Sequence, residues 1–300
     1  MRWFNRCIVQ ILPLFPKSFI WIFSRKYIAG KTLDEGKAKA KALNDEGCLV
    51  TLDVLGEDIT ELSEAEVTKD QCLAVLDAIR KEKLNGNLSI KLSSLGLKID
   101  RDVCAKNVRA LVQRAAEMGS FIRIDMEDSS TTDATLDLYR RLRKEYQNVG
   151  VVIQAYLKRS RDDVQRLIRE GIAQLRICKG IYIEPESIAF QDRQGVRENY
   201  LELIRMLFES GSYVGIATHD KTLVHRVLRL AEEMKVPKSV FEFQMLLGVT
   251  EHLRTDLISK GYALRVYVPY GEQWYGYCMR RMKENPQVAG YVVKSLFIRG

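Results

Sequence analysis

The sequence lacks the cysteine and histidine patterns of a metal site or a disulfide framework. Its six cysteines are scattered without a Cys-x-x-Cys pair, and its three histidines include no His-Glu-x-x-His motif. Dispersed cysteines of this kind are typical of reduced thiols in a cytosolic protein. The sequence therefore predicts neither a disulfide-stabilised fold nor a metalloenzyme.

The chain of 300 residues also has no Pro-, Gly- or Ser-rich linker, no low-complexity run and no short repeat. Because 46% of its residues are hydrophobic, it can bury one large core. We expect a single catalytic domain over residues 31–300, preceded by a distinct basic and aromatic segment, residues 1–30.

Residues 1–30 contain no acidic side chain, supply five of the eight net positive charges and hold two of the three tryptophans. A signal peptide fits poorly because prolines interrupt the apolar run. A spanning helix also fits poorly, since the uncharged stretch 7–16 is shorter than the roughly 20 residues required. A segment lying on an anionic membrane surface and a helical arm packed on the domain both remain open. Nucleic acid is not an expected partner, because the rest of the chain is nearly balanced in charge.

Short apolar runs alternate with helical patterns after residue 30. We expect strands at 48–55, 88–92, 121–126, 149–156, 174–179, 213–218, 241–245 and 263–268. Helices are expected at 33–46, 62–84, 101–118, 133–146, 161–170, 196–210, 220–235, 250–260 and 272–284. Eight such units with nearly continuous apolar strands predict a (β/α)8 barrel. The competing open doubly wound sheet usually carries a Gly-x-Gly-x-x-Gly motif, which is absent here.

Polar residues interrupt the expected strands near their C-terminal ends, where barrels of this class place their chemistry. These residues are Lys91, Asp125, Glu127, Gln154, Arg176, Lys179, Thr218, His219, Glu242, Gln244, Arg265 and Tyr267. Buried charges need a partner or a ligand, and Lys91 with Asp125 forms a natural pair across neighbouring strands. For His219, a general base and a cofactor hydrogen-bonding residue both remain open.

The last helical pattern, 272–284, contains two adjacent arginines. One face of this helix presents Tyr277, Arg280, Arg281 and Glu284 at the spacing i, i+3, i+4 and i+7. Paired guanidinium groups suit a small carboxylate, although a solvated basic face is the plainer alternative. With the polar strand ends, the pattern suggests a carboxylate ligand and a second, larger ligand rich in hydrogen-bonding atoms.

Seven motifs occur in order and together resemble a known family. They occupy residues 89–96, 123–128, 149–159, 175–182, 216–220, 241–249 and 265–284. The set resembles the FAD-dependent proline dehydrogenases, specifically the short monofunctional bacterial type, over roughly residues 30–295.

The resemblance implies an α/β fold, namely a distorted (β/α)8 TIM-type barrel. It would have an N-terminal helical arm and the last helix across the barrel top. FAD would bind at the C-terminal ends of the strands and take a hydride from C5 of L-proline at its N5 atom. The product would be Δ1-pyrroline-5-carboxylate, in the first step of proline catabolism. Electrons would pass to a quinone-type acceptor, and a separate pyrroline-5-carboxylate dehydrogenase would take the product. The expected location is cytoplasmic, peripheral on the inner face of the cell membrane.

The resemblance also implies roles for individual residues. Asp125 and Arg176 would be catalytic, with Arg176 near flavin N5. Substrate would be bound by Lys91, Arg280, Arg281, Tyr267, Tyr277, Leu246 and Glu284. FAD would be bound by Met126, Gln154, Arg176, Lys179, Gly180, Ile181, Thr218 and His219, and no metal is expected. Two alternatives stay open: the same flavoenzyme acting on hydroxyproline or another cyclic imino acid, and a barrel without catalysis that serves as a ligand-binding or scaffold protein.

Overall fold

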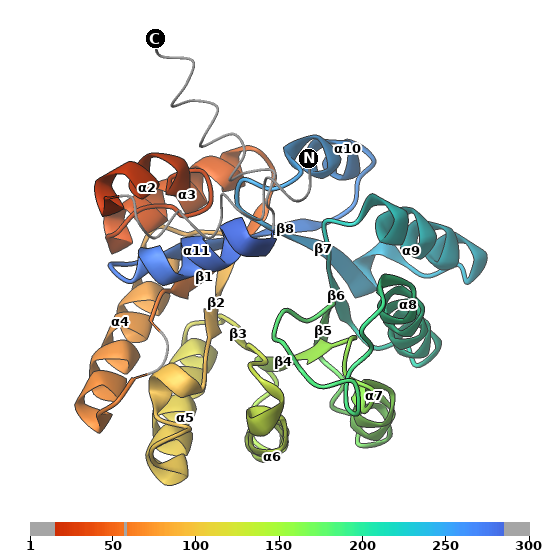
Figure 1. The fold of residues 1–300 in the computed structure, drawn as a ribbon, viewed down its shortest axis with the longest axis horizontal. Coiled ribbons are helices and arrows are strands. Elements are labelled where there is room, and N and C mark those ends of the chain that lie inside the picture. Colours follow the sequence, from red (N-terminus) through yellow and green to blue (C-terminus); the bar gives the residue numbers. More distant parts are fainter. Residues whose placement is uncertain (1–15, 57–58, 285–300) are drawn as a thin grey trace.

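The computed structural model describes residues 16–56 and 59–284, and its eight strands close into a parallel barrel in chain order (Figure 1). Each strand lies within two residues of its expected bounds. The strands are β1 (Leu49–Val54), β2 (Gly86–Ile90), β3 (Ile122–Ile124), β4 (Val149–Gln154), β5 (Leu175–Cys178), β6 (Val214–Ala217), β7 (Phe241–Leu246) and β8 (Leu264–Tyr270). The barrel closes where β8 pairs with β1, with Arg265 opposite Leu49. The expected fold class is confirmed.

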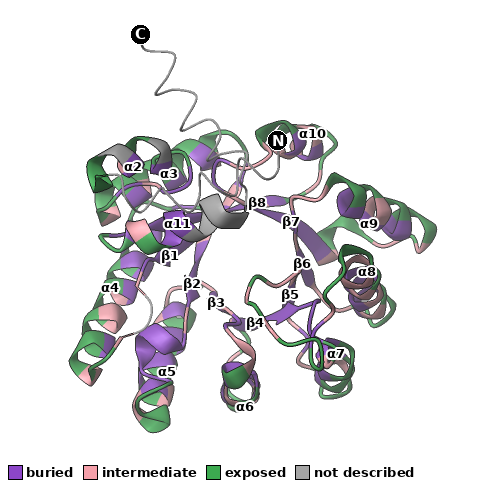
Figure 2. Cartoon of the chain, in the orientation of Figure 1, coloured by how far each residue is buried: buried purple, intermediate pink, exposed green. Residues whose placement is uncertain are grey.

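Seven helices connect successive strands and surround the barrel. They are α4 (Leu62–Lys81), α5 (Arg101–Glu117), α6 (Thr132–Arg143), α7 (Ser160–Arg169), α8 (Arg193–Glu209), α9 (Lys221–Glu233) and α10 (Glu251–Ser259). Short turns of 3-10 helix follow β2 and β3 and precede β7, at η2 (Ser93–Leu95), η3 (Ser129–Thr131) and η4 (Lys238–Val240). Each connecting helix buries the face toward the strands and exposes the opposite face (Figure 2), as an amphipathic helix on a sheet must.

Two further helices give the barrel its distortion. The helix α3 (Leu33–Asp45) packs against β1 and β8, the place that the eighth outer helix of a regular barrel would occupy. The helix α11 (Trp274–Glu284) instead lies inside the ring of outer helices, over the strands (Figure 1). The last helix therefore crosses the barrel top, as the family resemblance implies.

The N-terminal helix α2 (Lys17–Ser24) packs on α11. The rings of Trp21 and Trp274 meet edge to face with their centroids 4.7 Å apart. Ile20 and Ile28 are buried, so residues 16–30 contribute to the packed structure. Within the described part of the chain, no helix is both long enough and apolar enough to cross a membrane.

The strands carry two different faces. Residues such as Leu52, Leu88 and Ile122 form the apolar core, whereas their neighbours along each strand point into a polar barrel interior, as β alternation requires. The expectation that polar residues gather at the C-terminal ends was wrong for two of them. Glu242 and Arg265 are the second residues of β7 and β8, and they pair with each other at 2.5 Å near the N-terminal ends of these strands.

Candidate active site

A half-buried carboxylate, Asp125, links side chains from four strands of the barrel. Its Oδ1 atom accepts hydrogen bonds from Ser89 Oγ at 2.7 Å and from Arg176 Nη1 at 2.8 Å. Its Oδ2 atom accepts a hydrogen bond from the hydroxyl of Tyr267 at 2.8 Å. Ser89 comes from β2, Arg176 from β5 and Tyr267 from β8, so only closure of the barrel brings them together.

Lys91, which follows β2, lies beside this cluster with a side chain that is 11% exposed. Its Nζ atom is 3.8 Å from Asp125 Oδ2, which confirms the expected pair, and it donates to the hydroxyl of Tyr267 at 3.3 Å. The nearer partner is Asp53 of β1, at 2.7 Å. Sequence reasoning missed Asp53, although one carboxylate in an otherwise apolar strand was a usable signal, because a buried carboxylate requires a cation.

The phenol of Tyr267 stays protonated in this setting. Burial raises its pKa well above the usual value, and the charges of Asp125 and Asp53 raise it further. The hydroxyl can therefore donate to Asp125 while it accepts from Lys91. The guanidinium carbon of Arg176 lies 5.4 Å from the centre of the same ring, a cation–π distance. Four of the expected site residues thus form one hydrogen-bonded unit.

A second group of expected residues follows β3, β4 and β5. The amide nitrogen of Gln154 donates to the backbone carbonyl of Met126 at 3.2 Å. The Oε1 atom of Gln154 is buried and has no hydrogen-bond partner among the described residues. Since a buried acceptor without a donor is costly, this atom fits a ligand that brings an N–H group.

The backbone at Gly180, after β5, lies close to the ring of Tyr156. Its φ is +99°, and a Cβ atom at this position would lie 2.1 Å from the ring of Tyr156. Only glycine fits there. Ile181, the next expected residue, is about half exposed.

Two cations share one carboxylate after β5 and β6. Asp220 Oδ2 lies 2.6 Å from Lys179 Nζ and 2.8 Å from Arg197 Nη2. Burial alone would raise the pKa of Asp220, but the hydrogen bonds from these cations outweigh burial and lower the pKa to about 2. The cluster keeps one net positive charge, which suits an anionic group such as a phosphate. Sequence reasoning missed Arg197, because it reaches the site from α8 without a local motif.

The two residues after β6 are held by hydrogen bonds to the backbone. The Nε2 atom of His219 accepts the backbone N–H of Leu246 at 2.8 Å, so the neutral ring carries its proton on Nδ1. Because Nε2 already accepts this hydrogen bond, it is not available as a general base, and the cofactor hydrogen-bonding role of His219 stays a prediction. The hydroxyl of Thr218 is buried and accepts the backbone N–H of Asp220 at 3.1 Å.

The helix α11 carries four of the expected residues, Tyr277, Arg280, Arg281 and Glu284. Tyr277 is 7% exposed. Arg280, Arg281 and Glu284 fall within the bounds of the helix, and their side chains lie outside the described part of the structure.

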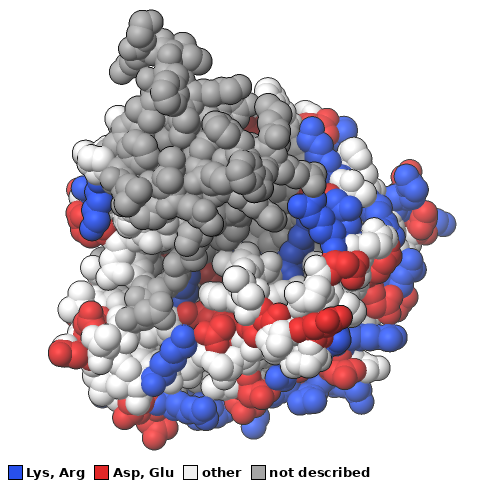
Figure 3. All heavy atoms as spheres, in the orientation of Figure 1, with Lys and Arg blue, Asp and Glu red and all other residues white. Residues whose placement is uncertain are grey.

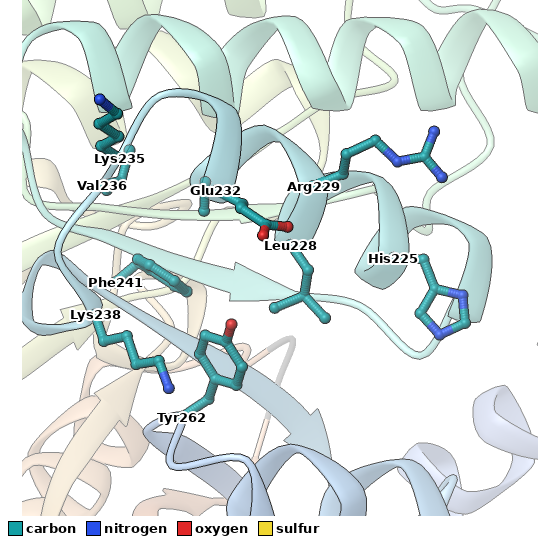
Figure 4. Close-up of a pocket in the computed structure, with 10 residues that line it drawn as sticks. His225, Leu228, Arg229, Glu232, Lys235, Val236, Lys238, Phe241 and Tyr262 are labelled. Carbon is teal, nitrogen blue, oxygen red and sulfur yellow. The ribbon is translucent and has the colours of Figure 1, made fainter.

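An open groove on the flank of the barrel lies apart from this site (Figure 4). It is bordered by α9, by the segment that leads into β7 and by Tyr262 just before β8, and so lies toward the N-terminal ends of these strands. Lys238 extends its ammonium group over the ring of Tyr262 at 4.2 Å. In residues 16–56 and 59–284, no group of three or more His, Cys, Asp or Glu side chains could hold a metal ion.

Comparisons with known proteins identify the family of this chain. A family model described as proline dehydrogenase matches residues 37–294. Proline dehydrogenase 1 of Bacillus subtilis is 37% identical over 273 residues, covering 91% of this chain and 90% of the relative. Proline dehydrogenase of Deinococcus radiodurans is 35% identical over 284 residues, covering 92% and 91%. The structure of proline utilization A from Bdellovibrio bacteriovorus, inactivated by N-propargylglycine, matches with a TM-score of 0.83 and 25% identity. That match covers 88% of this chain and 33% of the larger protein.

Proposed function

The chain belongs to the proline dehydrogenase family, and from this premise we propose that it oxidises L-proline to Δ1-pyrroline-5-carboxylate at the barrel mouth, with FAD as its cofactor. The observation that carries the proposal is the unit of Lys91, Asp125, Arg176 and Tyr267. It places two cations and a phenol around a single carboxylate, beneath the helix that carries two arginines.

The substrate carboxylate would be bound by Arg280 and Arg281 of α11, with Lys91 as the third cation. Paired guanidinium groups fix the orientation of a carboxylate as well as neutralising its charge. Glu284, one helical turn after Arg280, would hold the arginines in position. Tyr267, Tyr277 and Leu246 would form the walls around the proline ring. Asp125 would hold Lys91, Arg176 and Tyr267 in place.

The cofactor fits the second group of residues, which follow β3 to β6. The buried Oε1 atom of Gln154 has no hydrogen-bond partner in the described part of the chain and would accept an N–H group of the flavin ring. Gly180 lets the backbone pass against the ring of Tyr156 beside the proposed cofactor site, and Lys179 would meet a phosphate of the cofactor. Met126, Ile181, Thr218 and His219 would complete the binding surface. Arg176, held by Asp125, would lie beside the flavin.

When bound, FAD would accept the hydride that leaves C5 of proline. A cation held beside the flavin favours its reduced form, and Arg176 is held for this role. Asp125, Asp53 and Asp220 all pair with cations, so none of these three carboxylates is free to act as a strong base. Proline would therefore bind with its nitrogen already deprotonated or lose the proton to water. Orientation of the substrate then supplies much of the rate.

The test of this proposal is the visible spectrum of the purified protein without oxygen. A flavin band that bleaches when L-proline is added would establish the cofactor and the substrate together. A flavin band that persists with proline but bleaches with trans-4-hydroxyproline would show that hydroxyproline, and not proline, is the substrate. If no flavin binds even after incubation with FAD, the proposal fails.

The carboxylate site makes its own prediction. Arg281→Met should raise the proline KM by about tenfold or more, because a charge-assisted hydrogen bond contributes roughly 1.5–3 kcal/mol. FAD content, read from the ratio of flavin to protein absorbance, should stay unchanged. An unchanged KM would show that the proline carboxylate binds elsewhere.

A further inference from the structure

The barrel interior contains a continuous hydrogen-bonded chain that ends at Arg176. It begins with the buried pair of Arg265 and Glu242, where Arg265 Nε lies 2.5 Å from Glu242 Oε1 and Arg265 Nη2 lies 3.0 Å from Glu242 Oε2. Glu242 Oε1 also accepts a hydrogen bond from Gln244 Nε2 at 2.7 Å. Gln244 Oε1 in turn accepts from Arg176 Nε at 2.5 Å. None of these contacts involves a residue to which the resemblance assigns a role, apart from Arg176.

The direction of this chain is set by the chemistry of its members. An amide can present either its oxygen or its NH2 group, whereas a carboxylate only accepts and a guanidinium only donates. Glu242 is ionised, because the nearby charge of Arg265 and the hydrogen bonds that it accepts lower its pKa despite burial. Glu242 therefore requires the NH2 end of Gln244, and the oxygen end must face Arg176.

Packing prevents the side chain of Gln244 from moving away from Glu242 and Arg176. Gly215 of β6 lies beside it, and a Cβ atom on Gly215 would be 2.4 Å from Gln244 Nε2. Gln244 itself is only 6% exposed. With Nε of Arg176 bound to Gln244 and Nη1 bound to Asp125 at 2.8 Å, two edges of the guanidinium plane are fixed. A planar group held on two edges has one orientation.

We propose that Glu242 and Gln244 are positioning residues for the reaction, and that the charge of Glu242 orients the Gln244 amide and thereby holds Arg176 in its working position. This inference rests on the proposed function, in which Arg176 lies beside the flavin. Glu242 touches neither substrate nor cofactor in this scheme. Glu242 acts on Arg176 only through the side-chain amide of Gln244.

Two independent changes test the inference. Gln244→Met keeps the volume and removes the acceptor for Arg176. The double change Glu242→Met/Arg265→Met replaces the buried ion pair with apolar side chains of similar size, a change that buried pairs often tolerate. In that variant Gln244 keeps both of its amide groups but loses the carboxylate that fixes their direction. A matched control is Glu46→Met/Arg254→Met, which removes an ion pair of the same two residue types, 2.7 Å apart, on the outside of the barrel.

The readouts are the midpoint potential of the bound flavin, titrated with dyes and without proline, and the separate values of kcat and KM. Both test variants should shift the potential to more negative values and lower kcat by about tenfold. The proline KM should stay within about twofold, because the carboxylate is bound by other cations. The control should match the unmodified protein in every value.

A folded test variant with an unchanged potential and an unchanged kcat would overturn the inference, even if its melting temperature falls. If the control variant shows the same changes in potential and kcat as the test variants, the chain of hydrogen bonds is only structural and the inference also fails. The proposed function is judged separately. If the unmodified protein binds flavin but does not oxidise proline, the proline assignment fails, while the shift in potential still reports on Arg176.

Discussion

At the scale of single residues, the site is organised by carboxylates that each serve more than one partner. Asp125 accepts three hydrogen bonds at or below 2.8 Å, and Asp220 joins Lys179 and Arg197. A buried carboxylate is stable only when such partners compensate for its desolvation, so each of these groups fixes the geometry of its neighbours.

Asp220 makes the stability of the fold depend on acid pH. Its folded pKa of about 2 lies below the unfolded value of about 3.9, so its stabilising contribution is complete above pH 4 and is lost as the pH falls toward 2. Asp220→Asn keeps an acceptor for the start of α9 but removes the charge. The difference in unfolding free energy between the two proteins, measured with urea, should be constant from pH 7 to pH 5 and shrink between pH 4 and pH 2. A difference that does not change with pH would contradict the charge assignment.

At the scale of elements, the contact between α2 and α11 links the N-terminal helix to the helix that carries the paired arginines. Trp21 packs edge to face on Trp274, and Lys17 lies 5.5 Å from the centre of the ring of Tyr275. Because α11 has left the outer ring of helices, its lateral support comes partly from α2. One of the tryptophans that suggested a membrane surface therefore also contributes to packing within the protein.

Trp21→Ala should loosen this support. We expect a loss of about 1–2 kcal/mol of stability from the aromatic contact and its buried area, together with a higher proline KM, because the position of α11 sets the proposed carboxylate site. Ile22→Ala is the matched control, since Ile22 lies next to Trp21 on the same helix but is 64% exposed. Urea unfolding and steady-state kinetics measure the two effects. Equal behaviour of the two variants would show that α2 does not support α11.

At the scale of the whole molecule, the outer helices carry both signs of charge interspersed over the face in Figure 3. The excess of positive charge in the sequence comes largely from residues 1–30. We propose that this segment attaches the protein to an anionic membrane surface, near a quinone-type electron acceptor. Arg25 and Lys26 are exposed directly after α2 and could take part in this contact.

Flotation on vesicles with anionic lipid tests the attachment. Arg25→Glu/Lys26→Glu should reduce the bound fraction, because each cation near an anionic surface contributes about 1 kcal/mol. Lys81→Glu/Lys106→Glu changes two exposed cations on α4 and α5 by the same total charge and should leave binding unaltered. Substitutions are preferable to a long deletion, because Ile20 and Ile28 are buried in the fold. Equal binding of all three proteins would refute the attachment.

The barrel fold could be predicted from the sequence alone, because the alternation of apolar strands and amphipathic helices depends on local periodicity and on burial of one face of each element. The sequence also determined the family, through motifs that stand in order along the chain. The pairing of Lys91 with Asp125 followed from charges on neighbouring strands, which a parallel barrel in chain order must bring together.

The partners with which these charged residues form ion pairs are seen only in the three-dimensional structure. Asp53, rather than Asp125, is the nearer partner of Lys91, and Arg176 reaches Asp125 from β5, two strands away. Arg197 enters from α8, and the pair of Glu242 and Arg265 lies near the N-terminal ends of β7 and β8 instead of at the mouth. These choices depend on barrel closure and on side-chain reach across the interior, which are distances between residues far apart in sequence. No local pattern contains them, because a hydrogen bond forms only where the fold has already placed both groups.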